Sequence, residues 1–299
     1  MDTAADTTAL TIALAQYAQL PIGTPFDSFA RSVMSIAKSR ATSGAHPQLI
    51  VYPEMHLFGT PGVDGTESER LQLDAATDLH DDLIRSLSDL SRELGIWLIP
   101  GTLPEKAENG GIHNTAVVLS PQGKLVASYR KICPWRPHEG YVPGTSFTVV
   151  DIPGKGRIGL TICYDAWFPE ISRQVAWLGA DMIVNTVRTT TRDRLQEMVL
   201  ARSNAIVNQV YMASVNAAEP DGMGDSLLVD PEGHVLSHLA GPRQQLLITT
   251  VNLDHARRVR NDGTEGCNKL WEEFRDDDPP IPLPLYDGSI SSTRWAPRR

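Results

Sequence analysis

Three side chains in this chain of 299 residues could together perform nucleophilic chemistry: the cysteine Cys163, the carboxylate Glu54 and the lysine Lys131. A thiol can attack a carbonyl or nitrile carbon, a carboxylate can take the thiol proton and later activate water, and an ammonium group can stabilise the oxyanion that forms. Such a scheme needs no histidine. Taken singly, each residue has a plainer interpretation, namely a buried core cysteine, a solvated acid at a sheet edge and a surface lysine.

Each of these residues ends or directly follows a predicted β-strand. Residues 48–52, 124–130 and 157–163 have the apolar runs or alternation that strands require. Because the carboxyl ends of strands collect on one rim in α/β folds, we expect the three side chains to converge there. A helix is predicted over 168–178, and its N-terminus is expected to favour the thiolate of Cys163.

The remaining pattern predicts one α/β domain in which strands alternate with helices and hairpins give mixed sheets. Further strands are predicted over residues 10–16, 96–101, 113–120, 147–152, 182–185, 210–216, 225–229, 234–238 and 246–252. Further helices are predicted over residues 27–38, 78–94, 191–208 and 254–260, and irregular loops over residues 59–66 and 131–146. We place the domain at residues 1–275. The acidic and proline-rich segment 276–299 is predicted to be an extended arm that joins neither helix nor sheet.

Composition argues against several classes of function. Acidic residues outnumber basic ones by 36 to 27, giving a net charge of −9, and no basic run suggests a nucleic-acid partner, so we expect a small-molecule substrate. We predict no membrane association, because no apolar run is long enough to span a bilayer, and residues 1–6 lack the basic start of a secretory signal. Three cysteines without CxxC spacing favour a reducing, cytoplasmic location.

Two patterns suggest a cofactor only superficially. Residues 154–159 match GxGxxG, but they precede a predicted strand instead of following one, so the geometry that cradles a phosphate is absent. The eight histidines show neither HExxH nor paired metal-ligand spacing. We therefore predict neither a metal ion nor another cofactor.

Three short segments carry the candidate residues: Val-Tyr-Pro-Glu at 51–54, Tyr-Arg-Lys at 129–131 and Ile-Cys-Tyr-Asp-Ala-Trp-Phe-Pro-Glu at 162–170. In this order, they resemble the three motifs of the nitrilase superfamily, the carbon–nitrogen hydrolases. The similarity extends from about residue 9 to residue 260. Three motifs in the family's order are far more specific than any one of them alone.

This resemblance implies a four-layer αββα sandwich whose subunits associate through helices on an outer face. We therefore expect a homodimer or larger homo-oligomer, with the arm packing on a partner subunit. The resemblance also implies that Glu54 is the base, Lys131 the oxyanion stabiliser and Cys163 the nucleophile. The backbone N–H of Tyr164 would be a second oxyanion donor. An amide substrate would form a thioester that is then hydrolysed to an acid.

The loop from Lys131 to Gly144 is similar to that of aliphatic amidases and formamidases. The similarity implies that Glu139 helps to position the substrate and the attacking water, and that Trp135 lines a small acyl pocket. The sequence departs from those amidases at residues 164–166 and 187–190. We include Tyr164, Arg188 and Thr189 in the expected substrate-binding set. Arg188 could bind a substrate carboxylate, or it could form a structural ion pair.

These observations predict a cofactor-independent cysteine enzyme that hydrolyses a small linear amide to a carboxylic acid and ammonia. An N-carbamoyl amide hydrolase and a nitrilase remain alternatives within the same superfamily. A member that binds ligands without catalysis, or transfers acyl groups, is an alternative of a different class.

Overall fold

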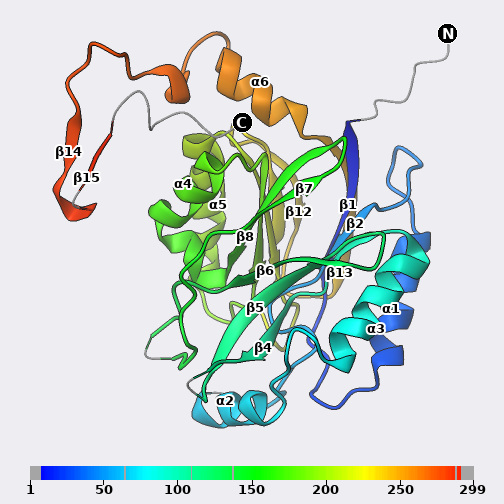
Figure 1. Cartoon of the computed structure of the whole chain (residues 1–299). Coiled ribbons are helices and arrows are strands. Elements are labelled where there is room, and N and C mark those ends of the chain that lie inside the picture. Colours follow the sequence, from blue (N-terminus) through cyan, green and yellow to red (C-terminus); the bar gives the residue numbers. More distant parts are fainter. Residues whose placement is uncertain (1–7, 64, 109, 137, 287, 291–299) are drawn as a thin grey trace.

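Two β-sheets packed face to face form the centre of the protein, and helices cover their outer faces (Figure 1). The structure is a computed structural model that describes residues 8–63, 65–108, 110–136, 138–286 and 288–290. The N-terminal segment 1–7 lies outside these ranges. Within the predicted arm, residues 287 and 291–299 also lie outside them.

Both sheets contain parallel and antiparallel pairs. The first has the order β13 (Gln245–Asn252), β1 (Ala9–Gln16), β2 (Leu49–Val51), β3 (Trp97–Ile99), β5 (Ile112–Leu119) and β4 (Thr102–Lys106), with β6 (Leu125–Arg130) paired to β5. The second has the order β12 (Val235–Leu239), β11 (Ser226–Val229), β10 (Tyr211–Asn216), β9 (Met182–Val187), β8 (Gly156–Ile162) and β7 (Val149–Ile152).

Three apolar clusters separate the layers. Helices α1 (Phe26–Lys38) and α3 (Asp82–Leu94) cover the first sheet, where Val33 and Leu87 pack in one buried cluster with Leu98 of β3. Helices α4 (Pro169–Trp177) and α5 (Arg194–Asn208) cover the second sheet with a separate cluster. A third cluster fills the space between the sheets. The predicted four-layer αββα sandwich is therefore confirmed.

Two elements near the site were not predicted. Helix α2 (Gly65–Asp74) begins inside the loop expected at residues 59–66, and it lacks the apolar stripe that reveals an amphipathic helix. Instead, Arg70 forms ion pairs with Glu67 and Asp74 one turn away on either side. Strand β4 was missed because it contains Pro104, which a sheet tolerates at its edge.

The C-terminal segment differs from the prediction of an arm without regular structure. After α6 (Asp254–Asp262) and the short helix η2 (Leu270–Glu272), strand β14 (Ile281–Leu283) pairs with β15 (Gly288–Ile290), with η3 (Pro284–Tyr286) between them. Prolines are tolerated here because both strands of an isolated hairpin are edge strands. Figure 1 shows this hairpin standing away from the sheets, on the side of α4. None of the described helices has the length and apolarity needed to cross a membrane.

Candidate active site

Two strands of the first sheet, β2 and β6, deliver Glu54 and Lys131 to the same side of that sheet. Strands β2 and β3 are parallel, β5 runs antiparallel to β3, and β6 runs antiparallel to β5, so β2 and β6 end on the same side. Glu54 follows β2 by three residues, and Lys131 directly follows β6. The predicted convergence at a strand rim is correct for this pair.

Close backbone packing holds both turns in place. Gly101 has φ +94°, and a Cβ there would lie 2.0 Å from the carbonyl oxygen of Pro53. At the other turn, the Gly144 N–H donates to the Lys131 carbonyl at 2.8 Å, and a Cβ on Gly144 would lie 2.2 Å from the Arg130 carbonyl oxygen. Glycine is therefore required beside each charged residue.

The ammonium group of Lys131 lies between two carboxylates. Its Nζ donates to Glu54 Oε1 at 3.2 Å, and to both carboxylate oxygens of Glu139, at 3.0 and 2.8 Å. The Lys131 and Glu54 side chains are only 1% and 3% exposed. The backbone N–H of Trp135 fixes Glu139 with a further hydrogen bond of 2.7 Å. The structure thus assembles three of the four predicted catalytic residues into one buried ionic cluster.

Burial and neighbouring charges set the proton affinities in this cluster. Burial raises the pKa of Glu54, although Lys131 and a hydrogen bond from the Asn114 amide, 2.7 Å long, favour its ionised form. Burial alone would lower the pKa of Lys131, but Glu54 and Glu139 reverse this effect and the pKa lies well above its usual value. Lys131 is therefore a permanent cation, and Glu54 is a carboxylate with a raised affinity for a proton.

Cys163 comes from the second sheet. It follows β8 and begins the short 3₁₀ helix η1 (Cys163–Trp167), with φ +46°, a left-handed conformation that is unfavourable for a side chain other than glycine. Asp165 holds this junction: its carboxylate accepts hydrogen bonds from the Ile162 N–H, the Cys133 N–H and the Tyr129 hydroxyl, at 3.0, 2.8 and 2.8 Å. The strained backbone at Cys163, the predicted nucleophile, is thus stabilised from two sides.

The expectation that a helix N-terminus favours the thiolate of Cys163 is wrong. Burial raises the pKa of Cys163 well above its ordinary value, the charge of Glu54 raises it further, and Lys131 only partly opposes them. The following helix is a single 3₁₀ turn, and α4 begins six residues later, at Pro169. Cys163 therefore rests as a thiol, so a nucleophilic role would require a base to take its proton.

A cleft of about 790 Å³ opens beside Glu54 and Glu139. Its wall combines helix α2, the loop after β6 and the segment after β9, and it includes Trp135, His138, Tyr141 and Arg188. The indole of Trp135 lies 4.2 Å from the ring of His138. Arg188 makes no ion pair among the described residues, and its buried Nε has no hydrogen-bond partner there. The alternative of a structural ion pair for Arg188 is therefore not observed.

The other two residues of the expected substrate-binding set do not line this cleft. Tyr164 packs its ring at 5.4 Å from that of Phe168, on the α4 side of the junction. Thr189 is buried, and its hydroxyl oxygen lies 3.8 Å from Cys163 Sγ. Thr189 thus contacts the predicted nucleophile.

Residues 11–261 match the carbon–nitrogen hydrolase family. The chain belongs to this family. A formamidase from Bacillus cereus (strain B4264) is 32% identical over 215 residues, which are 71% of this chain and 63% of the formamidase. The chain thus matches less than two thirds of that relative's length.

Solved structures of the nitrilase superfamily share the fold of this family member. Saccharomyces cerevisiae Nit3 superimposes with a TM-score of 0.73 at 26% identity, covering 85% of this chain and 94% of Nit3. A mutant of the amidase from Nesterenkonia sp. AN1 superimposes with a TM-score of 0.69 at 25% identity. The match covers 83% of this chain and 92% of the amidase chain. In that mutant the acetamide moiety of fluoroacetamide is covalently added at the active-site cysteine.

The sequence did not reveal several residues that support the candidate site. Asn114 binds Glu54, and Gln19 donates to the Glu54 carbonyl oxygen at 3.0 Å. Glu197 accepts a hydrogen bond of 2.8 Å from the Thr189 hydroxyl and pairs with Arg194 at 3.0 Å. The three-residue spacing of Arg194 and Glu197 on a helix was a detectable signal, but nothing in the sequence shows that this pair faces inward.

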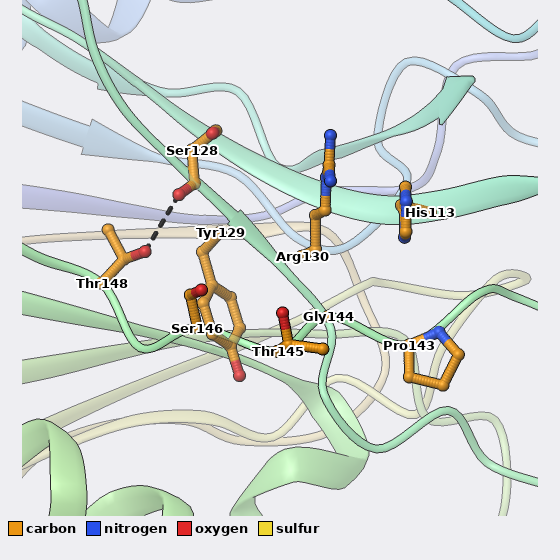
Figure 2. Close-up of a pocket in the computed structure, with 9 residues that line it drawn as sticks. All are labelled: His113, Ser128, Tyr129, Arg130, Pro143, Gly144, Thr145, Ser146 and Thr148. Carbon is orange, nitrogen blue, oxygen red and sulfur yellow. Dashed lines mark hydrogen bonds between the residues drawn. The ribbon is translucent and has the colours of Figure 1, made fainter. Parts of the chain in front are cut away.

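A second, smaller cavity of about 360 Å³ lies beside β6 and contains none of the predicted site residues. Figure 2 shows Tyr129 and Arg130 pointing in opposite directions from this strand. Tyr129 reaches Asp165 in the interior, whereas Arg130 pairs with Glu105 at 2.6 Å. The strand that ends at Lys131 is therefore fixed on both of its faces.

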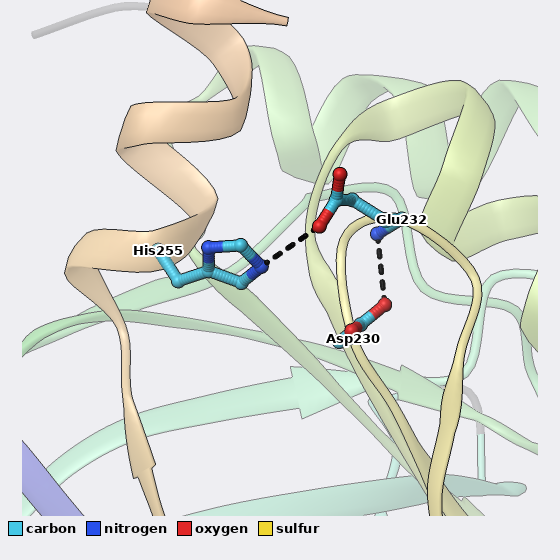
Figure 3. A group of neighbouring side chains, drawn as sticks. All are labelled: Asp230, Glu232 and His255. Atoms are coloured by element: carbon cyan, nitrogen blue, oxygen red, sulfur yellow. Dashed lines mark hydrogen bonds and ion pairs between the residues drawn. The ribbon is translucent and has the colours of Figure 1, made fainter. Parts of the chain in front are cut away.

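Within the described ranges, one group of carboxylates and imidazole could hold a metal ion: Asp230, Glu232 and His255 (Figure 3). The turn after β11 already uses Asp230, whose Oδ1 accepts the N–H groups of Glu232 and His234 at 2.9 Å each. Glu232 pairs with His255 of α6 at 3.4 Å. These contacts hold the turn after β11 and join it to α6, which explains why the three side chains lie together. None of the three lines the cleft.

Proposed function

We propose that the protein hydrolyses small linear amides to carboxylic acids and ammonia through an acyl thioester on Cys163. The observation that carries the proposal is the buried cluster in which Lys131 binds both Glu54 and Glu139, and whose charges act on the Cys163 thiol. A permanent cation, a proton-accepting carboxylate and a thiol are the parts that acyl transfer needs.

In the first half-reaction, Cys163 Sγ attacks the amide carbon while its proton passes to Glu54. The oxygen of the tetrahedral intermediate gains a negative charge, which Lys131 and the Tyr164 backbone N–H stabilise. Glu54 then protonates the nitrogen, the carbon–nitrogen bond breaks, and ammonia leaves a thioester behind.

In the second half-reaction, Glu54 removes a proton from a water molecule that Glu139 helps to position, and the water oxygen attacks the thioester carbon. Collapse of this intermediate breaks the carbon–sulfur bond, releases the acid and returns the proton to Cys163. The raised pKa of Glu54 suits a group that must accept and donate a proton in turn.

The roles of Cys163, Lys131 and Glu54 are tested by single substitutions with ammonia release as the readout. We expect Cys163→Ala and Lys131→Ala to lower kcat by a factor on the order of 10³ or more, with both variants folded but Lys131→Ala less stable because it leaves two carboxylates unpaired. Wild-type or Glu54→Gln protein mixed with substrate should give an acyl adduct that maps to Cys163 in intact-mass and peptide analysis. Cys267→Ala, which removes an exposed free thiol, is the matched control. Full turnover by Cys163→Ala would refute the mechanism.

The same assay separates the alternatives. Ureido acids would release ammonia together with carbon dioxide, and nitriles would release ammonia without any amide being supplied. Hydroxamate formation, when hydroxylamine competes with water, would indicate acyl transfer. If the protein binds amides but releases no ammonia and forms no hydroxamate, it would be a member of the family that binds ligands without catalysis.

We also propose that the substrate carries a carboxylate at the end remote from its amide. Arg188 lines the cleft beside Glu54, and its guanidinium has no carboxylate partner among the described residues. Guanidinium binds carboxylates in a two-pronged geometry. Arg188 could bind the carboxylate of a ureido acid in the same way. This contact therefore selects for a carboxylate at the far end of the substrate and does not determine which bond is cleaved.

A matched pair of amides tests this role of Arg188. Succinamate and butyramide have equal chain lengths and differ by one carboxylate. We expect wild-type kcat/KM to favour succinamate, and Arg188→Leu to lose about 1.5–3 kcal/mol of that preference, roughly tenfold or more, while butyramide turnover changes little. Equal losses for both amides would show that Arg188 is structural.

Three further proposals follow the sequence predictions. We propose that the hydrolase domain spans residues 1–275, that the C-terminal segment packs on a second subunit of a homo-oligomer, and that the protein works in a reducing, cytoplasmic environment. The last is supported by the three cysteines, which are all free.

A further inference from the structure

A buried chain of polar groups leads away from Cys163 through Thr189 and Glu197 to Arg194. Thr189 Oγ1 lies 3.8 Å from Cys163 Sγ and donates its hydrogen to Glu197 Oε1 at 2.8 Å. Glu197 Oε2 accepts from Arg194 Nη1 at 3.0 Å. The side chains of Arg194 and Glu197 are only 1% and 5% exposed. No step of the proposed mechanism uses these groups.

The donors and acceptors in this chain fix the direction of the contact with sulfur. Because Glu197 is paired with Arg194, it is a carboxylate and can only accept hydrogen bonds. The single hydroxyl hydrogen of Thr189 must therefore point to Glu197. What Thr189 offers to Cys163 is a lone pair, so the thiol S–H is the donor in that contact.

The backbone of Thr189 is equally constrained. Its N–H donates to Asn216 Oδ1 at 2.9 Å, and its carbonyl oxygen accepts from Asn216 Nδ2 at 3.2 Å. Arg194 in turn donates to the carbonyl oxygens of Gly224 and Asp225. Both ends of the chain are thus anchored, and the hydroxyl has little freedom to turn toward the sulfur.

We propose that Glu197 is a positioning residue which, through the Thr189 hydroxyl, keeps Cys163 as a neutral thiol until Glu54 takes its proton in the substrate complex. The inference rests on the proposed function, because it assumes that Cys163 is the nucleophile. An oriented lone pair stabilises S–H and disfavours a thiolate at the same place.

Four charged groups act on this thiol from the surrounding elements. Glu54 follows β2, Lys131 follows β6, Glu139 lies in the loop after β6, and Glu197 projects from α5. Lys131 alone favours the thiolate, and the three carboxylates oppose it. Removing the Glu197 charge while keeping its shape should shift this balance toward the thiolate.

The first test measures the rate at which iodoacetamide alkylates Cys163 as a function of pH. We expect Glu197→Gln to move the midpoint of the profile about one pH unit lower, which corresponds to a tenfold larger thiolate fraction on the acid side. Thr189→Ser keeps the hydroxyl and should retain the wild-type midpoint. An unchanged midpoint in folded Glu197→Gln would overturn the proposal.

Glu197→Gln leaves Arg194 without its partner and could fail to fold, so a second measurement keeps the proposal testable. The S–H stretching band of Cys163 is identified as the band that Cys163→Ala loses. In Thr189→Val we expect this band to move to the higher frequency of a thiol without an acceptor, and in Thr189→Ser to stay in place. The same frequency in wild type and Thr189→Val would refute the S–H contact.

Neither measurement depends on amide turnover. If both give the expected shifts and no amide is hydrolysed, the proposed function fails while the control of Cys163 by Glu197 stands. If amides are hydrolysed and neither shift occurs, the positioning role alone is lost.

Discussion

At the scale of single residues, the site depends on the buried ammonium group of Lys131, which donates hydrogen bonds to both Glu54 and Glu139. Lys131 cannot be removed without leaving Glu54 and Glu139 as close like charges, and truncating one member of a buried ion pair typically costs about 3–5 kcal/mol. In the proposed mechanism, the same cation stabilises the oxyanion. Under that proposal, structure and catalysis depend on the same contacts.

Asn114 should set the pH at which the base becomes active. Its amide favours ionised Glu54, whose pKa already lies above the ordinary value of 4.5 because of burial. Asn114→Leu removes this hydrogen bond, so the pKa of Glu54 rises further. Since the ionised form is the base, the acid limb of the kcat/KM profile should move up by about one pH unit.

The matched control for this prediction is Asn185→Leu. Asn185 is also a buried asparagine on a strand. Its side-chain oxygen accepts a hydrogen bond of 3.1 Å from the Thr161 hydroxyl and does not contact Glu54. We expect its acid limb to match the wild type. A limb that stays in place in Asn114→Leu would show that another group controls the acid side of the profile.

At the scale of elements, the turn from β8 into η1 is held by the carboxylate of Asp165. All three of its hydrogen-bond partners are donors, and burial raises its pKa to about 6. Asp165→Asn replaces one acceptor oxygen with an NH₂ group that faces a donor. We expect the free energy of unfolding at pH 8 to fall by about 1–3 kcal/mol, and kcat to fall with it because Cys163 shifts.

Denaturant unfolding monitored by circular dichroism measures this effect. Asp151→Asn on the neighbouring strand β7 is the control, since Asp151 is largely exposed and its pair with Arg157 lies at the surface. Exposed pairs contribute little, so this variant should unfold like the wild type. Equal stability of Asp165→Asn and the wild type would mean that the junction does not depend on the carboxylate.

The elements that sequence reasoning predicted correctly are those with a strong periodic pattern. Strand β8 alternates Ile158, Leu160 and Ile162, and α3 presents a stripe of leucines toward the first sheet. Helix α2 is too polar for its period to be visible, and the C-terminal hairpin contains prolines that argue against strands. In α2, ion pairs one turn apart take the place of an apolar stripe, and in the hairpin the prolines lie on edge strands that tolerate them.

The same limit applies to the site. Glu54 and Lys131 could be placed together because each follows a recognisable strand of an α/β fold, whereas the roles of Glu54, Lys131 and Cys163 were expected from the three motifs that resemble the nitrilase superfamily. Asn114 and Glu197 could not be predicted, because their partners lie 60 and 8 residues away and only the packed fold shows which way they face. The raised pKa of Cys163 was likewise hidden, since burial is a property of the whole fold.

At the scale of the whole molecule, one face of α5 exposes apolar side chains to solvent. Leu195 and Val199 are each 66% exposed and Ile206 is 45% exposed, and their spacing places them on one side of the helix. The C-terminal hairpin stands beside the neighbouring helix α4, where the Tyr286 hydroxyl donates to Glu170. Apolar side chains gathered on one face mark a site of association.

We predict that this face forms the contact of a homodimer. Leu195→Glu combined with Val199→Glu places two charges in the contact, where desolvation and like-charge repulsion oppose association. Light scattering coupled to size exclusion should then give the mass of one chain, 32.8 kDa, where the wild type gives twice that mass. Val126→Glu, at an exposed apolar position on β6, is the control and should remain dimeric. A double variant that keeps the wild-type mass would place the subunit contact on another face.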